Sequence, residues 1–311
     1  MAKVLAVFGA TGQQGGSVIE FVLNDPELSK QYQLRAITRD VTSKSAQTLK
    51  GKNVEVVEGD SSQPASLDTA LAGAHTVFAM TVPSFTPDGE QVEYASGKVI
   101  ADAAVAQGAK YIIFSTLPHV SELSGGKYTN AIHCDAKAKI EQYIRGLPIK
   151  SAFVALGMYI SNYYHLPFFA PQETADGSYV MARSNSPKAK FPMVNAEGDT
   201  GKFVGAILAQ PENYKGKVFL AATAMYDTDE VAAAMSKATG KTVVYKQISL
   251  DAWKATLPFA QDIFGDTFSA MEEFGYCGAE TESLLAWSVQ NARGKLTTVE
   301  EYLKENPLPL A

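Results

Sequence analysis

Short apolar runs rich in β-branched residues alternate with segments of helical periodicity through the first half of the chain. The runs predict six strands, at Lys3–Phe8, Leu34–Thr38, Val54–Val57, Thr76–Thr81, Tyr111–Ser115 and Ser151–Leu156. The segments between them predict helices at Ser17–Leu23, Ser66–Leu71, Glu90–Gln107 and Ala136–Arg145. Strands and helices alternating at this spacing form right-handed βαβ units, so we predict an α/β fold with a doubly wound parallel sheet.

The pattern changes after Gly157, where aromatic, proline and glycine residues gather. Helices are predicted at 200–210 and 229–238, strands at 218–222 and 243–248, and further helices after Asp251. We therefore divide the chain into residues 1–156, which carry the sheet, and residues 157–311, a smaller α/β lobe for a substrate or partner. Residues of about 200–222 are expected to return to the large sheet.

A glycine-rich turn lies between the first strand and the first helix. Its residues are Gly9, Ala10, Thr11, Gly12, Gln13, Gln14 and Gly15. Glycines at this spacing permit a tight turn and let the backbone approach a pyrophosphate, while the helix N-terminus offers free N–H groups to the phosphates. An ordinary strand-to-helix turn is the alternative. The position of the turn at the start of a βαβ series favours a dinucleotide-binding site of the Rossmann type.

The end of the second strand bears on which dinucleotide is bound, and it reads Thr38-Arg39-Asp40. An acidic residue here holds the ribose hydroxyls of NAD, whereas an arginine suits the 2′-phosphate of NADP. Arg39 therefore favours NADP(H), and residues 1–156 become the expected NADP-binding Rossmann domain. The alternative is a solvated Arg39 with Asp40 on the ribose. Asp60, after the third strand, can accept from the adenine amino group or cap a turn.

Composition narrows the function classes. The 311 residues are 46% hydrophobic and 19% charged, which allows a large core, and the net charge of −6 disfavours direct nucleic-acid binding. Cys134, Cys277 and the four histidines show no metal-binding spacing, so no metal is expected. The chain shows neither a secretory signal nor an apolar run of membrane-spanning length, so we expect a cytoplasmic protein outside the membrane.

The chain resembles the NmrA-like family, an atypical branch of the short-chain dehydrogenase/reductase superfamily. The motifs that carry the resemblance are the glycine turn, the end of the second strand, and the segments GDSSQPASL (59–67) and HCDAK (133–137). The resemblance is clear from residue 1 to about residue 165 and weaker beyond. It implies a Rossmann domain with a small C-terminal lobe, and NADP(H) as the nucleotide. It also implies cofactor contacts from the glycine turn and from Arg39, Asp60, Ser61, Thr81, Lys137, Tyr159, Ile160, Ser161 and Asn162.

The residues available for chemistry differ from those of active short-chain dehydrogenases. Those enzymes carry Tyr-x-x-x-Lys on the helix after the fifth strand, where the lysine lowers the tyrosine pKa for proton transfer. The matching stretch here runs from His133 to Lys137, so the tyrosine is missing. A literal Tyr94-x-x-x-Lys98 lies on the helix before the fifth strand, and we interpret it as a surface pair.

Two functions follow from the resemblance. The first, which we rank higher, is a regulator that binds NADP(H) without turnover and senses the redox state of the cell. It would act as a transcriptional co-regulator through contact with a protein partner, in the cytoplasm or the nucleus. The second is an NADPH-dependent reductase similar to isoflavone reductases, acting on a small carbonyl or aromatic substrate. Lys137 or His133 would then be the acid/base, assisted by Ser115 or Thr116, although Lys137 can instead hold the ribose and His133 can have no catalytic duty.

The aromatic stretch Tyr159–Phe169 bears on the choice between these functions, because it can line a substrate pocket or fill the core. An open apolar cavity beside the nicotinamide would favour the reductase, and a filled one the sensor. A third class, an adaptor protein with a vestigial pocket, is also open at this point.

Overall fold

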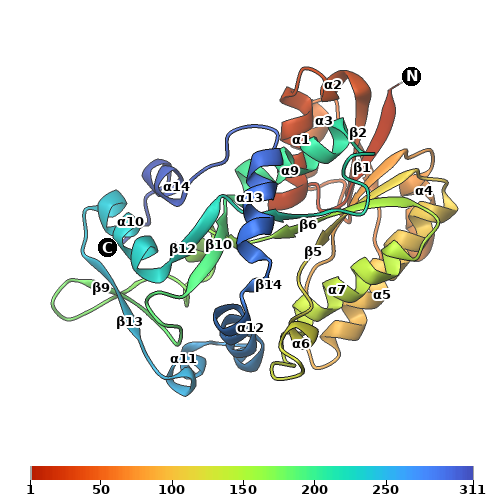
Figure 1. The fold of residues 1–311 in the computed structure, drawn as a ribbon. Coiled ribbons are helices and arrows are strands. Elements are labelled where there is room, and N and C mark those ends of the chain that lie inside the picture. The colour runs from red at the N-terminus through yellow and green to blue at the C-terminus, as the bar shows by residue number, and fades with distance from the viewer. Residues whose placement is uncertain (1, 311) are drawn as a thin grey trace.

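The computed structural model describes residues 2–310, and its largest element is a seven-stranded parallel sheet (Figure 1). The strand order is β11-β6-β5-β4-β1-β2-β3. The strands are β1 (Lys3–Val7), β2 (Tyr32–Thr38), β3 (Glu55–Glu58), β4 (Thr76–Ala79), β5 (Tyr111–Thr116), β6 (Lys150–Leu156) and β11 (Val218–Ala221). The first six lie within about two residues of their predicted bounds. The predicted α/β fold with a doubly wound parallel sheet is confirmed.

Helices cover both faces of this sheet. The helices around it are α1 (Gln13–Asn24), α2 (Leu28–Gln31), α3 (Lys44–Gly51), α4 (Pro64–Leu71), α5 (Gly89–Ala106), α6 (Val120–Leu123), α7 (Ile132–Arg145) and α9 (Ala196–Ala209). Leu5 and Val7 point into the core shared with α1 and α9, whereas Ala6 points into the core shared with α5 and α7. This alternation is what a parallel sheet buried on both faces requires.

Several helices differ from the sequence prediction; the short helices α2 and α6, for example, were not predicted. α3 was not predicted, because only Ala46 and Leu49 of its residues are buried, and two apolar positions are too few to show helical periodicity. α1, α7 and α9 each begin four residues earlier than expected. At α9 the reason is Asn195, whose side chain accepts a hydrogen bond from the Gly198 N–H (3.0 Å) and so caps the helix. Within residues 2–310, no helix combines the length and hydropathy that crossing a membrane requires.

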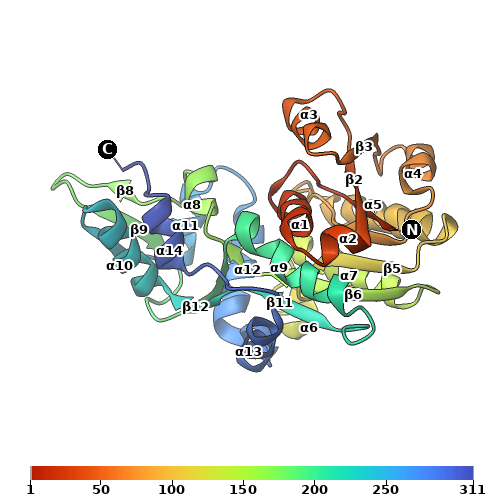
Figure 2. The same ribbon diagram turned by 90° about the horizontal axis from the view of Figure 1, so that it is seen from above.

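A second lobe lies beside the large sheet and contains the described end of the chain (Figures 1 and 2). It has two three-stranded sheets, β12-β10-β7 and β13-β9-β8, around an aromatic core that includes Trp253 and Phe268. Its strands are β7 (Met158–Tyr159), β8 (Gln172–Glu173), β9 (Tyr179–Arg183), β10 (Lys190–Val194), β12 (Ala224–Asp227) and β13 (Val243–Gln247). The further elements after residue 156 are α8 (Asn162–His165), α10 (Thr228–Thr239), α11 (Leu250–Thr256), α12 (Gln261–Phe274), β14 (Tyr276–Ala279), α13 (Thr281–Asn291) and α14 (Val299–Glu305). Of these, α13 packs on β11 of the large sheet.

Residues beyond 156 also complete the large sheet. β11 pairs with β6 in parallel, from Val218 opposite Phe153 to Ala221 opposite Leu156. α9 packs on α1, and the Gly201 N–H donates a hydrogen bond to Ser17 Oγ (2.9 Å). The C-terminal half therefore contributes to both parts of the molecule, and the division at residue 156 stays a prediction.

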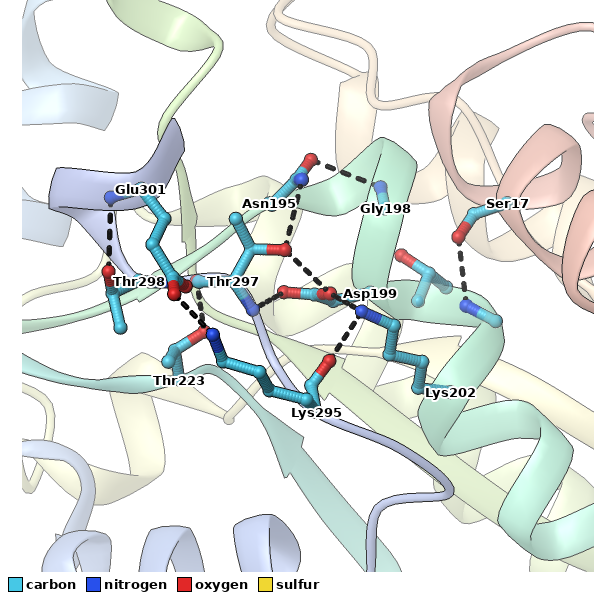
Figure 3. A network of polar contacts seen from close by, with 12 residues as sticks. Ser17, Asn195, Gly198, Asp199, Lys202, Thr223, Lys295, Thr297, Thr298 and Glu301 are labelled. Atoms are coloured by element: carbon cyan, nitrogen blue, oxygen red, sulfur yellow. Dashed lines mark hydrogen bonds and ion pairs between the residues drawn. The ribbon is translucent and has the colours of Figure 1, made fainter. Parts of the chain in front are cut away.

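A buried polar network ties together segments that run between the two parts (Figure 3). Asp199 is fully buried; its carboxylate accepts hydrogen bonds from the Thr297 N–H (2.9 Å) and hydroxyl (3.1 Å) and pairs with Lys202 (2.6 Å). The Thr223 hydroxyl donates to the Thr297 carbonyl (2.8 Å). A buried carboxylate is stable only when it is paired in this way. The network thus fixes the segment before α14 against the start of α9.

Candidate functional site

A cleft of about 1010 Å³ runs along the carboxyl ends of the parallel strands. Its floor includes Gly9, Arg39, Asp60 and Thr81, which follow β1, β2, β3 and β4. Its other wall comes from the second lobe, where most of the lining side chains are aromatic. Open α/β sheets bind their ligands at this edge, so the cleft is the candidate site.

The glycine turn has the shape of a phosphate cradle. Gly9 has a φ of +63°, which glycine adopts without strain, and its carbonyl accepts a hydrogen bond from the Gly12 N–H (2.9 Å). α1 begins at Gln13 and packs so closely on the turn that a Cβ at Gly15 would lie 2.4 Å from the Gly9 oxygen. The first N–H groups of α1 have no helical acceptors, which is the arrangement that binds a pyrophosphate. The residues present therefore fit a dinucleotide.

Two glutamines of the turn reach across to the second lobe. The Gln14 amide donates to the Tyr159 hydroxyl (2.6 Å), and the Ser161 hydroxyl donates to Gln13 Oε1 (2.9 Å). Burial raises the pKa of Tyr159 to about 12, so its hydroxyl keeps its proton. We call these two hydrogen bonds the glutamine clasp. It joins the phosphate cradle directly to the segment that follows β6.

The ends of β2 and β3 present one arginine and two aspartates to the cleft. Arg39 is exposed and, within residues 2–310, makes no side-chain hydrogen bond. Asp40 accepts hydrogen bonds from the Thr42 N–H (2.8 Å) and hydroxyl (2.6 Å), which lower its pKa and stabilise its own turn. Asp60 likewise accepts from the Ser62 N–H (2.8 Å), which lowers its pKa. Arg39 is therefore the group at this end of the cleft with the most hydrogen-bonding capacity left for a ligand.

Most of the predicted site residues line the cleft. They are Gly9, Thr11, Gly12, Gln13, Gln14, Arg39, Asp60, Ser61, Thr81, Ser115, Thr116, His133, Lys137, Tyr159 and Asn162. Four predicted cofactor contacts lie behind this surface. Ala10 and Ile160 are core residues, the Ser161 hydroxyl is engaged in the glutamine clasp, and Gly15 is covered by the turn itself. Within residues 2–310, no group of three metal-binding side chains gathers.

Lys137 is held in a buried network that the sequence analysis did not foresee. Its ammonium donates to the Thr81 carbonyl (3.1 Å) and hydroxyl (2.9 Å) and pairs with the Glu93 carboxylate. Thr81 in turn donates its hydroxyl to Glu93 (2.6 Å). An ammonium has three donors, and all three are used here. In this arrangement Lys137 stabilises the segment after β4, and neither a ribose nor a substrate could receive a hydrogen bond from it without displacing one of these partners.

His133 borders the cleft one helical turn before Lys137. Burial, and then the charge of Lys137, lower the pKa of His133 to about 4, so the imidazole is neutral near pH 7. Its Nε2 lies 3.4 Å from the Cys134 sulfur, and its Nδ1 has no partner within residues 2–310. A neutral imidazole is a poor general acid at neutral pH. His133 can still accept or donate one hydrogen bond to a bound molecule.

Five phenylalanines pack ring against ring and line the part of the cleft that we call the aromatic chamber: Phe85, Phe169, Phe259, Phe264 and Phe268. Phe85 comes from the loop after β4, and the other four come from the second lobe. The Phe85 and Phe259 rings are 5.7 Å apart, and 38% and 42% of their surfaces are exposed. Phe85 also lies 5.8 Å from the His133 ring. Large exposed apolar rings facing a cleft mark a binding surface.

The Tyr94-x-x-x-Lys98 pair lies away from this chemistry. Tyr94 packs edge-on against Tyr143, and Lys98 pairs with Asp102 one helical turn further along α5. Neither residue lines the cleft. The interpretation as a surface feature agrees with this placement, although the partner of Lys98 is Asp102 rather than Tyr94.

Comparison with known proteins shows the family to which the chain belongs. The model of the NmrA-like family matches residues 1–303, which include the glycine turn, the HCDAK segment and most of the second lobe. The chain belongs to the NmrA-like family. The resemblance inferred from the first 165 residues is thereby confirmed, and it extends through the second lobe.

The relatives of this NmrA-like protein include proteins named as oxidoreductases or reductases and a protein named as a transcriptional regulator. The NmrA-like family domain-containing oxidoreductase FrzB of Cladobotryum is 31% identical, with 82% of this chain and 79% of FrzB covered. The structure of NmrA, a negative transcriptional regulator in complex with NAD, superposes with a TM-score of 0.82 at 24% identity over 98% and 95% of the two chains. The NADP(H) complex of Citrobacter triphenylmethane reductase gives 0.74 at 23% identity over 97% and 99%. At these identities the two structures show a shared fold.

Proposed function

We propose that this NmrA-like protein is an NADPH-dependent reductase of an apolar, ring-bearing carbonyl compound. The observation that carries the proposal is the aromatic chamber, which opens onto the cleft. A dinucleotide with its pyrophosphate on the glycine turn and its adenosine toward Arg39 directs its other end to β4, β5 and β6, where the chamber begins. This proposal places the reductase before the regulator, whereas the sequence analysis ranked the regulator first.

The choice of NADP(H) rests on Arg39, because structures of the same fold were solved with NAD and with NADP(H). Arg39 has its guanidinium donors available at the end of β2, whereas Asp40 is engaged in its own turn. A guanidinium pairs strongly with a phosphate. Triphenylmethane reductase, which shares the fold, was solved with NADP(H) bound.

NADPH would supply a hydride to the substrate, and the residues of the chain would orient the substrate and exclude water. The titratable groups that border the chamber have pKa values moved away from neutrality. Burial lowers the pKa of His133 and raises those of Cys134 and Tyr276. Without a strong proton donor, the favoured acceptors are conjugated carbonyls and quinones, whose reduced anions are stabilised by delocalisation and take a proton from water after they leave the cleft.

One observation favours the regulatory function as a second candidate. The glutamine clasp joins the phosphate cradle to the second lobe through Tyr159 and Ser161. A dinucleotide that displaces Gln13 or Gln14 would alter this connection, and a ligand shifts a conformational equilibrium by its differential affinity for the two states. The same clasp would then carry the redox state of the nucleotide to a partner protein.

NADPH oxidation with a naphthoquinone and with a conjugated aryl ketone tests the reductase directly. We expect turnover that falls at least about tenfold in kcat/KM in Phe259→Ala, because the ring closes the chamber over the substrate. Phe274→Ala, which alters a phenylalanine outside the cleft, is the matched control and should keep wild-type rates. NADP affinity should be unchanged in both variants.

The same samples distinguish the regulator. If no compound of either class is reduced while NADP binds, the reductase proposal is wrong. Protease digestion with and without NADP then tests the alternative, since a regulator must change its cleavage pattern or its affinity for a partner when the nucleotide binds. An unchanged pattern together with no turnover would contradict both functions.

A further inference from the structure

A second pocket, of about 450 Å³, lies at the opposite edge of the large sheet. It opens where β1, β2, β4, β5 and β6 begin, beneath the end of α9. Its apolar lining includes Ile113, Ile149, Ile207 and Leu208. β1 alone is about 16 Å long, so a molecule bound here is separated from the cleft by the length of the strands.

The polar lining of this pocket is basic. Lys3, Lys110 and Lys150 all contribute to it, and His75 lies among them. Within residues 2–310, Lys3 and Lys110 have neither an ion pair nor a side-chain hydrogen bond; Lys3 has only the Tyr32 ring, 5.9 Å away. The one carboxylate in the lining, Glu212, pairs with Lys150 (2.6 Å). Two ammonium groups at one pocket therefore lack an anion, in a chain of net charge −6.

Lysines often gather at this edge of a parallel sheet because helices end there and expose carbonyl groups. In this pocket those carbonyls already have donors. The Tyr32 hydroxyl donates to the Leu208 carbonyl (3.1 Å), and the Tyr111 hydroxyl donates to the Pro211 carbonyl (2.9 Å). The Ala206 carbonyl accepts from the Gln210 N–H. Lys3 and Lys110 are thus not needed to complete the end of α9.

His75 lines the same pocket as Lys3 and Lys110. Its Nδ1 bonds the Thr76 hydroxyl (2.9 Å), and the ring is half-buried. Burial, and then the charges of Lys3 and Lys110, lower the pKa of His75. An anion bound between the exposed ammonium groups of Lys3 and Lys110 would offset the repulsion between them.

We propose that this pocket is a second ligand site, which binds an organic anion. The apolar body of the ligand lies against Pro148, Ile149 and Pro211, the apolar lining residues with exposed surface, and its carboxylate or phosphate lies between Lys3 and Lys110. The volume falls within the range of small-molecule sites, and lysine ammonium groups are common partners of both anions. The site is distinct from the candidate dinucleotide cleft and does not depend on the proposed reductase activity.

Calorimetric titration with benzoate and with phenyl phosphate, at constant ionic strength, tests the site. We expect saturable binding of at least one of them, with benzamide, the neutral analogue, binding at least about tenfold more weakly. The double variant Lys3→Gln/Lys110→Gln should weaken anion binding at least about tenfold. The control Lys30→Gln/Lys50→Gln removes the same charge from exposed lysines elsewhere and should bind like the wild type.

The imidazole of His75 gives an independent readout by NMR. A bound anion stabilises the charged ring, so benzoate or phenyl phosphate should raise the pKa of His75 in the wild type but not in Lys3→Gln/Lys110→Gln. NADP affinity should be the same in all three proteins. Equal affinity for benzamide and benzoate, equal weakening in both double variants, or the absence of saturable binding would each overturn the proposal.

Discussion

The ammonium of Lys137 and the carboxylate of Glu93 form an ion pair in the interior, between α7 and α5, with Thr81 bonded to both. The Glu93 side chain is completely buried. Removing one member of such a pair leaves an uncompensated buried charge, which costs about 3–5 kcal/mol. We therefore expect Glu93→Gln to lower the free energy of unfolding by about this amount, measured by urea denaturation.

Two further variants complete this prediction. Glu20→Gln breaks the half-exposed pair with Lys52 and should change the free energy of unfolding by about 1 kcal/mol or less. Glu93→Leu combined with Lys137→Met removes both charges and should recover most of the stability that Glu93→Gln loses. An equal loss in Glu93→Gln and Glu20→Gln would mean that the interior pair has no special role.

Arg39 should set the preference for NADP over NAD. Substituting Arg39→Ala removes a charge-assisted contact with the 2′-phosphate, so we expect NADP affinity to fall by about 1.5–3 kcal/mol while NAD affinity stays constant. Calorimetric titration of both nucleotides measures the two changes. Lys44→Ala, an exposed lysine at the start of α3, is the control; if it removes the preference instead, the 2′-phosphate lies nearer to that residue.

Two glycines of the phosphate cradle should respond differently to substitution. A Cβ at Gly12 would meet only the Gly9 oxygen, at 3.4 Å, so the fold has room for Gly12→Val, but the branched side chain fills the cleft where a pyrophosphate would lie. We expect this variant to fold and to lose NADP binding. Gly15→Ala should instead lower the unfolding temperature, because its Cβ would lie 2.4 Å from the Gly9 oxygen. NADP binding by Gly12→Val with unchanged affinity would remove the cradle from the site.

His133 should make the stability of the protein depend on pH. Its pKa is about 4 in the folded chain and near 6.5 in the unfolded chain, so between these values the unfolded state binds more protons. Stability should therefore fall as the pH decreases from 6.5 to 4, by up to about 3 kcal/mol from this group. His133→Phe should lack this part of the dependence, and His165→Gln, an exposed histidine, should keep it. Parallel profiles for wild type and His133→Phe would contradict the assignment.

The sheet and the phosphate cradle could be predicted from the sequence because both depend on neighbours along the chain. β-branched runs define the strands, and the glycine turn is complete within residues 9–15. The chamber depends on residues far apart, since Phe85 meets Phe259 only after the second lobe folds against the sheet. No local pattern encodes that contact.

The buried position of Glu93 could be predicted from the sequence only in part. Its partner Lys137 is 44 positions away, so the pair itself is not visible in the sequence. The helical spacing does carry a signal, because Glu93 shares the buried face of α5 with Gly97, Ile100, Ala101 and Ala104. A glutamate on the apolar face of a helix requires a buried partner, and Lys137 of α7 is that partner.

The chain crosses several times between the large sheet and the second lobe, and this limits how the specificity of such proteins can change. β6 leads into β7, β10 leads into α9, and β11 leads into β12, and hydrogen bonds of Thr297 join the second and third of these crossings. Neither part is a single continuous stretch, so recombination of whole modules cannot replace the chamber while keeping the sheet. New specificities must arise by point substitution and by changes in loops such as those of Phe85 and Phe259.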